Sequence, residues 1–148
     1  MKDLECKEII KWGKNKKNKK GKPFLVMVFG QHLTIDLTGC NSQKLKDLEL
    51  HHDLLADTPH LIGMTPITQP YVFKYSGLVP EDRGITGSVI IAESHISIHS
   101  FELKNYCFVD VFSCKPFDTK RATEIFVEAF EPVKYMVNVV DRGIDFPR

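Results

Sequence analysis

The chain contains 148 residues, of which 43% are hydrophobic and 26% charged, and its formal net charge is +1. This length and composition fit one globular domain with its own core, and they exclude collagen-like, coiled-coil and fully disordered chains. No apolar run approaches the ~20 residues of a membrane span, and the first thirty positions lack the pattern of a secretory signal. We therefore expect a cytoplasmic protein that makes no membrane contact.

The four cysteines and six histidines follow no metal-binding pattern. No two cysteines have CxxC spacing, and no HExxH sequence occurs. Such spacings are what structural and catalytic zinc sites require, so we expect no metal and no disulfide framework.

Charge is distributed unevenly along the chain. Residues 11–22 contain seven lysines and no acidic residue, whereas residues 23–148 contain eleven basic and sixteen acidic side chains. A block of like charges cannot bury a core. We therefore expect residues 1–22 to form a basic flexible leader and residues 23–148 to form a single domain, and we do not expect nucleic acid as a partner.

The apolar pattern after residue 22 predicts several strands and two helical regions. The expected strands span residues 24–29, 32–37, 70–75, 87–92, 95–101, 106–112 and 133–140. A first helical region should begin at Asn41 or Ser42 and reach about residue 62, with Pro59 breaking or restarting it. A second helix should span about residues 118–130, capped by Asp118 or Thr119.

This order of elements predicts an α+β fold. We expect a two-layer α/β sandwich with a mainly antiparallel sheet and helices on one face. Three histidines of the first helical region are expected to face solvent: His51, His52 and His60.

The segment Glu93-Ser94-His95-Ile96-Ser97-Ile98-His99 places reactive side chains in a predicted strand. In a regular strand Ser94 and His99 point to opposite faces, so a turn or bulge at Glu93-Ser94 would be needed to bring them together. The residues alone leave two interpretations open. The first is a row of polar side chains on a solvated sheet face. The second is a Ser–His–Asp hydrolase with Asp110 as the third residue, although the GxSxG elbow is missing.

Four blocks of sequence keep a fixed spacing around Ser94. They are Gly30-Gln31-His32-Leu33 with Cys40, Gly84-Ile85-Thr86-Gly87, Glu93 to His99, and Asp110-Val111-Phe112-Ser113-Cys114. A hydroxyl residue lies eight positions before the serine, a histidine five after it and a cysteine twenty after it. In these blocks, from about residue 30 to residue 140, the chain resembles the S-adenosylmethionine decarboxylase proenzymes of prokaryotes.

The resemblance implies that the chain makes its own cofactor. In this family the Glu–Ser bond breaks without a protease, so Glu93 and Ser94 would be separated, giving chains of residues 1–93 and 94–148. Ser94 would become a pyruvoyl group. This ketone forms a Schiff base with the substrate amine and accepts the electrons released with carbon dioxide, so neither pyridoxal phosphate nor a metal is needed.

The resemblance also implies roles for the remaining residues. His99 would abstract a proton during processing, and the Thr86 hydroxyl would assist. Cys114 would return a proton to the α-carbon of the substrate. Glu93 would fit the cleavage turn and contribute a carboxylate to the mature site. The family forms homodimers of processed protomers with sites near the interface, and its product serves polyamine synthesis, spermidine included.

Two segments bear on the small-molecule substrate. Where familiar family members read Thr-Trp-Pro-Glu or Thr-Phe-Pro-Glu, this chain reads Ser100-Phe101-Glu102-Leu103. Glu102 therefore precedes by one residue the position that binds the ribose in the family. Phe101 and Glu102 are therefore candidate substrate contacts. Glu81 and Asp82 lie in an acidic loop and could pair with a guanidinium or ammonium group. S-adenosylmethionine is the first expectation. The alternatives are an arginine or ornithine decarboxylase on the same scaffold, or a processing-defective regulatory homologue.

Overall fold

The computed structural model describes residues 28–144 and 146–147. Its elements in chain order are β1 (Gly30–Thr38), α1 (Ser42–Lys46), α2 (Leu48–Leu61), β2 (Tyr71–Tyr75), η1 (Pro80–Asp82), β3 (Gly84–Ile91), β4 (Ser94–Phe101), β5 (Tyr106–Ser113), α3 (Thr119–Phe130) and β6 (Lys134–Arg142). The expected leader, and most of the strand expected at 24–29, lie outside the described residues. Within the described part of the chain, none of the helices has the length and apolar character needed to span a membrane.

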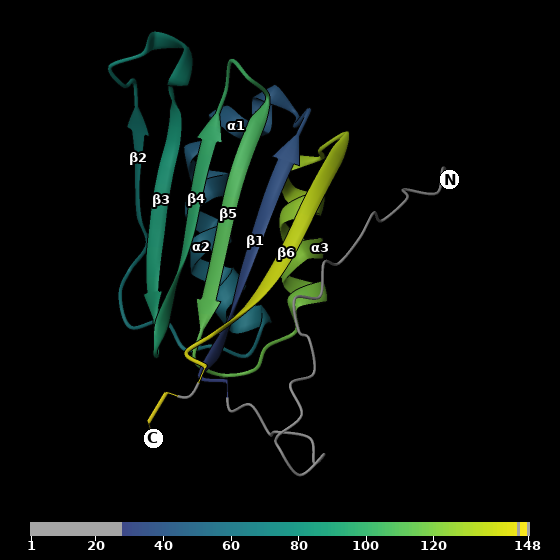
Figure 1. Cartoon of the computed structure of the whole chain (residues 1–148). Coiled ribbons are helices and arrows are strands. Elements are labelled where there is room, and N and C mark those ends of the chain that lie inside the picture. Colours follow the sequence, from purple (N-terminus) through teal and green to yellow (C-terminus); the bar gives the residue numbers. More distant parts are fainter. Residues whose placement is uncertain (1–27, 145, 148) are drawn as a thin grey trace.

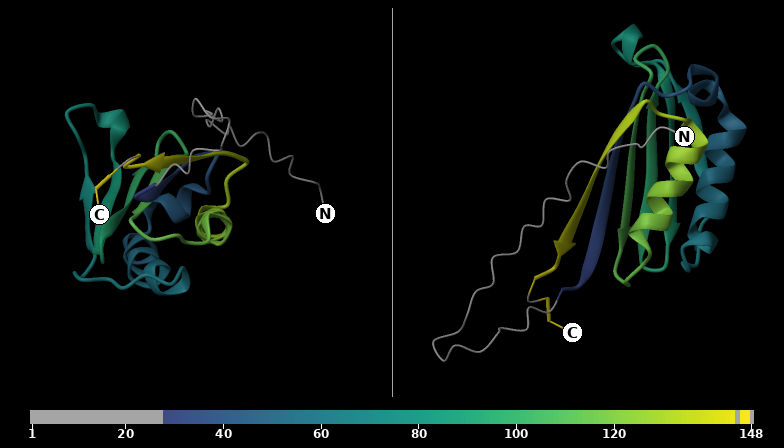
Figure 2. Two further views of the ribbon diagram at one scale, coloured as in Figure 1. Left: turned by 60° about the horizontal axis from the view of Figure 1, so that its bottom comes forward. Right: turned by 90° about the vertical axis from the view of Figure 1, so that its right-hand side faces the viewer.

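The six strands form one sheet in the order β2-β3-β4-β5-β1-β6. Every neighbouring pair in this order is antiparallel. The helices α1, α2 and α3 lie on the same face of the sheet (Figure 1, Figure 2). The prediction of a two-layer α/β sandwich with helices on one face is therefore confirmed.

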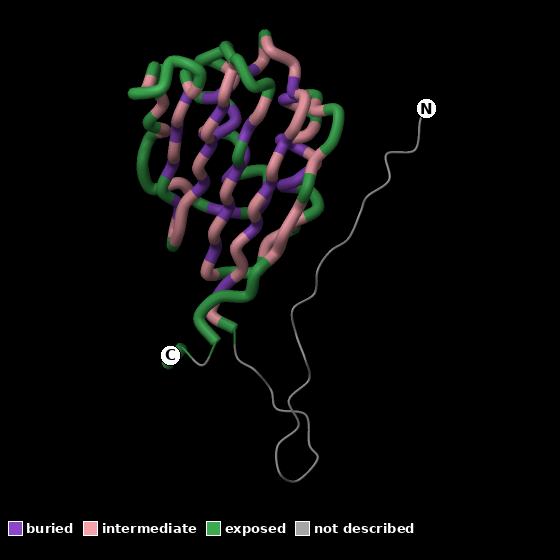
Figure 3. The backbone as a smooth tube through the Cα atoms, turned by 45° about the horizontal axis from the view of Figure 1, so that its top comes forward, coloured by how far each residue is buried: buried purple, intermediate pink, exposed green. Residues whose placement is uncertain are grey.

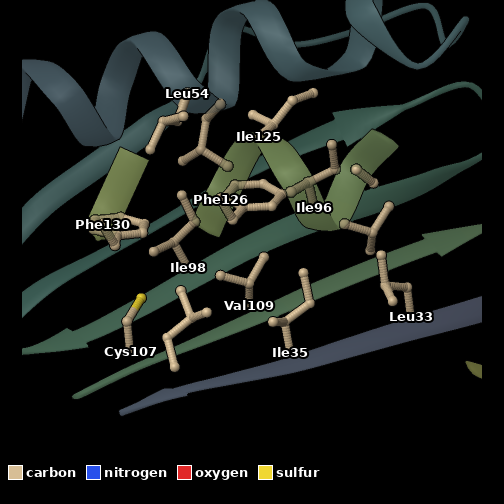
Figure 4. Packing of buried hydrophobic residues seen from close by; sticks show 14 of the residues in the cluster. Leu33, Ile35, Leu54, Ile96, Ile98, Cys107, Val109, Ile125, Phe126 and Phe130 are labelled. Atoms are coloured by element: carbon tan, nitrogen blue, oxygen red, sulfur yellow. The ribbon is translucent and has the colours of Figure 1, made fainter. Parts of the chain in front are cut away.

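The core lies between the sheet and its helices. Alternate residues of the central strands point to the helices, and this alternation appears as stripes of burial along each strand (Figure 3). Ile96 and Ile98 of β4 and Val109 of β5 are fully buried in one cluster with Phe126 and Phe130 of α3 (Figure 4). Each such side chain contributes about 1.5–3 kcal/mol when it is removed from water, which makes this face the source of the fold's stability.

Two of the predicted helix starts are confirmed by their caps. The Asn41 side chain accepts the backbone N–H of Gln43 at 3.0 Å, and the Asp118 carboxylate accepts that of Arg121 at 2.9 Å. Both side chains satisfy a donor that the first helical turn leaves without a partner.

The prediction that Pro59 breaks the first helical region is wrong. The division falls at Asp47, whose carboxylate accepts the Leu50 N–H at 3.0 Å and so begins α2. Pro59 lies inside α2, which continues to Leu61. Proline removes one helical hydrogen bond, but here it stands in the last turn and its ring is buried, so the loss is offset by packing.

The prediction that His51 faces solvent is also wrong. Helical spacing puts it on the inward face of α2 with Leu54 and Leu55, and it is 0% exposed. Its Nδ1 atom lies 2.7 Å from the Asp47 carbonyl oxygen, and burial lowers the pKa of His51. The other two histidines of this group, His52 and His60, are exposed as predicted.

The sheet face opposite the helices carries no helix in the part of the chain that the structure describes, and we call it the open face (Figure 2). Strand register places six residues in one row across this face: Phe73, Thr86, His99, Phe108, Asp36 and Met136. Phe73 is 37% exposed, Phe108 39% and Met136 53%. Apolar exposure of this kind on one face is typical of an interaction surface.

Candidate active site

A two-residue turn at Ala92-Glu93 joins β3 to β4, since Ile91 and Ser94 are register partners on either side of it. Ser94, the first residue of β4, is also the register partner of Ser113, the last residue of β5. The beginning of β4 and the end of β5 therefore lie together at the lower end of the sheet in Figure 1.

Three expected site residues meet at this end, and we call Glu93, Ser94 and Cys114 the cleavage cluster. The Ser94 hydroxyl donates a hydrogen bond to the carbonyl oxygen of Glu93, which belongs to the bond expected to break. The Ser94 Oγ and Cys114 Sγ atoms are 3.3 Å apart. The structure thus places a hydroxyl nucleophile at its own preceding carbonyl, with a thiol beside it, and these residues fit the formation of a pyruvoyl group.

The described thiols differ in their surroundings. Burial raises the pKa of Cys40 to about 11 and that of Cys107 well above its ordinary value. Both thiols therefore stay protonated at neutral pH and lie in the core. Cys114 is half-buried and lies at the sheet end, so it is the described cysteine whose thiol lies next to Ser94.

A second pair of expected site residues meets elsewhere on the sheet. Thr86 of β3 and His99 of β4 are register partners, and the Thr86 Oγ1 atom lies 3.3 Å from the His99 Nδ1 atom. We call these two residues the hydroxyl–imidazole pair. The pair lies on the open face, toward the upper end of the sheet in Figure 1.

Within one chain, the cleavage cluster and the hydroxyl–imidazole pair lie far apart. Ser94 and His99 are five residues apart on β4, which runs in unbroken register with β3 and β5. At the rise of an extended strand this separates them by about 17 Å, and their strand positions face opposite sides. The turn at Ala92-Glu93 joins the two strands but does not bring His99 to Ser94.

The proposed Ser–His–Asp arrangement is not formed either. The Asp110 carboxylate lies 3.0 Å from the Nε2 atom of His32, and its register partner on β4 is Ser97. Burial and, to a smaller extent, the neighbouring His32 lower the pKa of His95, while the Asp110 carboxylate opposes this shift. Asp110 therefore belongs to a separate polar cluster of the open face.

The expected substrate-binding carboxylates lie at the upper end of the sheet, next to η1. The Glu102 carboxylate pairs with the Arg83 guanidinium at 2.5 Å, and the Asp82 carboxylate pairs with the Lys104 ammonium. Glu81 is exposed in η1. Two of these three acids are thus already neutralised by basic side chains of this chain.

Beside these ion pairs lies a hollow lined by Phe101, Lys104, Tyr106 and Phe108. The Phe108 ring centroid lies 5.8 Å from that of Phe101 and 4.8 Å from that of Tyr106. Phe101 was an expected substrate contact, whereas Tyr106 and Phe108 were missed. The signal for them was present in the alternation of large aromatic side chains along 106–112, which puts them on one strand face.

Comparisons with known proteins identify relatives of this chain in sequence and in structure. The family model of S-adenosylmethionine decarboxylase matches residues 31–143. The S-adenosylmethionine decarboxylase proenzyme of Thermodesulfovibrio yellowstonii is 34% identical over 116 residues, covering 78% of this chain and 82% of that protein. The proenzyme of the same name from Pyrococcus furiosus is 29% identical over 117 residues, covering 78% of this chain and 80% of that protein.

A solved structure is similar as well. The crystal structure of adenosylmethionine decarboxylase from Aquifex aeolicus matches with a TM-score of 0.68 at 29% identity, covering 79% of this chain and 92% of that chain. The fold and the matched sequence define an enzyme of the decarboxylase class. The chain belongs to the S-adenosylmethionine decarboxylase family. These comparisons give no support to the arginine, ornithine or regulatory alternatives.

Proposed function

We propose that this protein decarboxylates S-adenosylmethionine with a pyruvoyl group that it makes by cleaving its own chain between Glu93 and Ser94. One observation carries the proposal: the Ser94 hydroxyl donates a hydrogen bond to the Glu93 carbonyl oxygen, and the Cys114 sulfur lies 3.3 Å from the Ser94 hydroxyl oxygen. Cleavage would give chains of residues 1–93 and 94–148. The product would supply aminopropyl groups for polyamine synthesis, and we assign the enzyme to the cytoplasm.

The cleavage steps balance with water as the sole co-reactant. The Ser94 Oγ atom attacks the Glu93 carbonyl carbon, and the bond from that carbon to the Ser94 nitrogen breaks to give an ester. A base removes the α-proton of Ser94 and the Cβ–Oγ bond breaks. A Cα=Cβ double bond forms, and the oxygen leaves with Glu93 as its carboxylate. The enamine that results takes a proton at Cβ, and water then displaces its nitrogen as ammonia, which leaves the ketone at the start of the second chain.

We assign removal of the α-proton to His99 and assistance by a hydroxyl to Thr86, both supplied by a second copy of the chain. A base must lie within about 3 Å of the proton that it takes. The separation of about 17 Å along β4 keeps His99 from reaching Ser94 of its own chain. His99 of the partner subunit has no such restriction.

Two features favour a homodimer through the open face. Phe73, Phe108 and Met136 expose apolar surface there, which a second copy would cover. The cleavage cluster and the hydroxyl–imidazole pair lie toward opposite ends of the sheet (Figure 1). A copy related by a two-fold axis and lying antiparallel over the open face would bring the upper end of each sheet to the lower end of the other. Two-fold symmetry would then create two equivalent sites.

In the mature enzyme the pyruvoyl group would supply an electrophilic carbonyl that takes up the electron pair released with carbon dioxide. The residues of this chain would hold the substrate and move protons. Cys114 would carry at Sγ the proton that returns to the α-carbon, since its sulfur already lies next to Ser94. Glu93 would keep its side-chain carboxylate at the site after it becomes the end of the first chain.

The upper end of the sheet would bind the far part of the substrate. We propose that the aromatic hollow of Phe101, Tyr106 and Phe108 contacts the adenine, with Glu102, held by Arg83, near the ribose. A cationic amino acid would need free carboxylates there. Asp82 and Glu102 are already paired with basic side chains, so this arrangement favours S-adenosylmethionine.

Intact-mass measurement of purified protein tests the proposal. We expect a chain of residues 1–93 and one of residues 94–148, the second blocked to Edman degradation by its keto end, while Ser94→Ala stays intact. Release of labelled carbon dioxide should then be greatest from S-adenosylmethionine, compared with arginine and ornithine at equal concentrations. A wild-type chain that stays whole after prolonged incubation would refute self-cleavage. A tenfold or greater preference for arginine or ornithine would refute the substrate assignment.

A further inference from the structure

The turn that carries Cys114 is closed by a buried hydroxyl. Ser113 is the last residue of β5 and is 1% exposed. Its Oγ atom accepts the backbone N–H of Lys115 at 3.0 Å, so the hydrogen bond spans Cys114. The same Oγ atom donates to the Sδ atom of Met64 at 3.5 Å. The hydroxyl therefore both accepts and donates a hydrogen bond, and rotation of the Cys114 backbone would break the bond from the Lys115 N–H.

The beginning of β1 confines the same turn from its other side. A Cβ atom added to Gly30 would lie 2.2 Å from the Ser113 carbonyl oxygen and 2.9 Å from the Cys114 Cα atom. Real Cβ atoms do not approach backbone this closely, so any larger residue at this position would push the turn away. Gly30 is thus required by the close approach of two backbones.

We propose that Ser113 is a positioning residue for Cys114: its hydroxyl holds the turn that keeps the thiol next to Ser94, and Gly30 leaves the space that this turn occupies. The proposal rests on the assignment of Cys114 as the proton donor. Neither Ser113 nor Gly30 touches the reacting atoms in this assignment. Both act through the place of the Cys114 sulfur, 3.3 Å from the Ser94 hydroxyl oxygen.

The reaction makes this position matter. A proton donor must reach the α-carbon after carbon dioxide leaves, and displacing a catalytic group by about 1 Å costs on the order of a hundredfold in rate. Without the Ser113 hydroxyl, the Lys115 N–H loses its acceptor and the turn can rotate. Substrate binding would be largely unaffected, because the assigned adenine and ribose contacts come from the upper end of the partner subunit's sheet and not from the turn that Ser113 holds.

Four variants test this role. Ser113→Ala removes the hydroxyl, Ser113→Thr retains it, and Gly30→Ala displaces the turn from the opposite side. Ser100→Ala is the matched control. Ser100 is also buried, at 3% exposure. Its hydroxyl oxygen accepts the Ile85 backbone N–H at 3.0 Å and lies 3.2 Å from the carbonyl oxygens of Leu45 and Ile85, far from the cleavage cluster.

The first readout is independent of turnover. In uncleavable Ser94→Ala protein, with Cys6→Ser so that the described thiols alone report, we would measure iodoacetamide alkylation of Cys114 against pH and identify the site by mass spectrometry. Cys40 and Cys107 are buried and should react slowly. We expect Ser113→Ala and Gly30→Ala to change the rate or its pH midpoint by threefold or ~0.5 pH units or more. Ser113→Thr and Ser100→Ala should match the parent.

The second readout is steady-state kinetics of the processed enzymes. We expect kcat of Ser113→Ala to fall about ten- to hundredfold with KM within about twofold, and Ser113→Thr to recover most of the loss. Unchanged alkylation in both Ser113→Ala and Gly30→Ala would overturn the positioning role. Equal losses in Ser113→Ala and Ser100→Ala would also overturn it, since they would indicate a general effect on stability. If Cys114→Ala turned over normally, the proton-donor assignment would fail, while the alkylation result would still decide whether Ser113 positions the thiol.

Discussion

Mixing two inactive variants tests whether each site is built from two copies of the chain. Ser94→Ala cannot form the ketone but keeps the hydroxyl–imidazole pair. His99→Ala keeps the Ser94 hydroxyl but lacks the base. If His99 acts across the interface, a mixed dimer contains one complete site and one site that lacks both residues. The His99→Ala chain of that dimer should then be cleaved, although neither variant cleaves alone.

The magnitude follows from the geometry and from random pairing. Along β4 the imidazole lies about 17 Å from Ser94, against a reach of about 3 Å for proton transfer, so complementation within one chain would require β4 to come apart. In a dimer that assembles randomly from equal amounts of both chains, about half of each variant is in mixed dimers. Co-expression should therefore cleave roughly half of the His99→Ala chains and none of the Ser94→Ala chains, as measured by intact mass.

A reciprocal mixture provides the control. When wild type is co-expressed with the double variant Ser94→Ala/His99→Ala, a mixed dimer holds no complete site, so about half of the wild-type chains should stay whole. If each site lies within one chain, all wild-type chains cleave and the first mixture stays intact. That pair of results, with dimers present by light scattering, would refute the shared site.

Three further predictions concern single features. Cys114→Ala should still be cleaved but lose ~10²–10⁴ in kcat, the range for a positioned acid, and a turnover number equal to wild type would contradict this. Deletion of residues 1–21 should leave cleavage and turnover within a few fold, because we propose that the domain begins at residue 23, and loss of folding would contradict it. Burial lowers the pKa of His51 in the folded chain from 6.5, so below that pH the unfolded chain binds more protons than the folded chain. The free energy of unfolding should fall as pH drops below about 6.5, by at most ~1.4 kcal/mol per pH unit from this residue, and denaturant titrations should show a shallower fall in His51→Leu.

Much of the fold could be predicted because local rules decide it. The helix at 119–130 combines an aspartate cap with an apolar stripe, and β4 and β5 alternate apolar and polar residues with the period of a strand. Burial of one face of each element then requires a second layer. The failures at Pro59 and His51 have one cause: both residues gain their environment from packing of α2, which local propensity does not contain.

Some contacts of the site could also be predicted from the sequence, and others could not. The hydroxyl–imidazole pair follows from hairpin counting, because a two-residue turn at Ala92-Glu93 makes Thr86 and His99 partners. The ion pair of Arg83 with Glu102 and the bond from Lys115 to Ser113 were not predictable. Each depends on the path of a loop or turn, and loop paths are set by tertiary contacts rather than by the residue types in the loop.

The spacing of the matched blocks itself bears on how the site is assembled. A hydroxyl eight residues before Ser94 and a histidine five residues after it become cross-strand neighbours whenever the turn between the strands has two residues. This spacing also places both side chains about 17 Å from the turn, because five residues of each strand lie between. The hydrogen bonds between the strands keep the two side chains there. If this spacing is retained for catalysis, the residues that match the processing role cannot act on their own Ser94. On a regular hairpin, therefore, the spacing of Thr86, Ser94 and His99 indicates a site that is built from two chains.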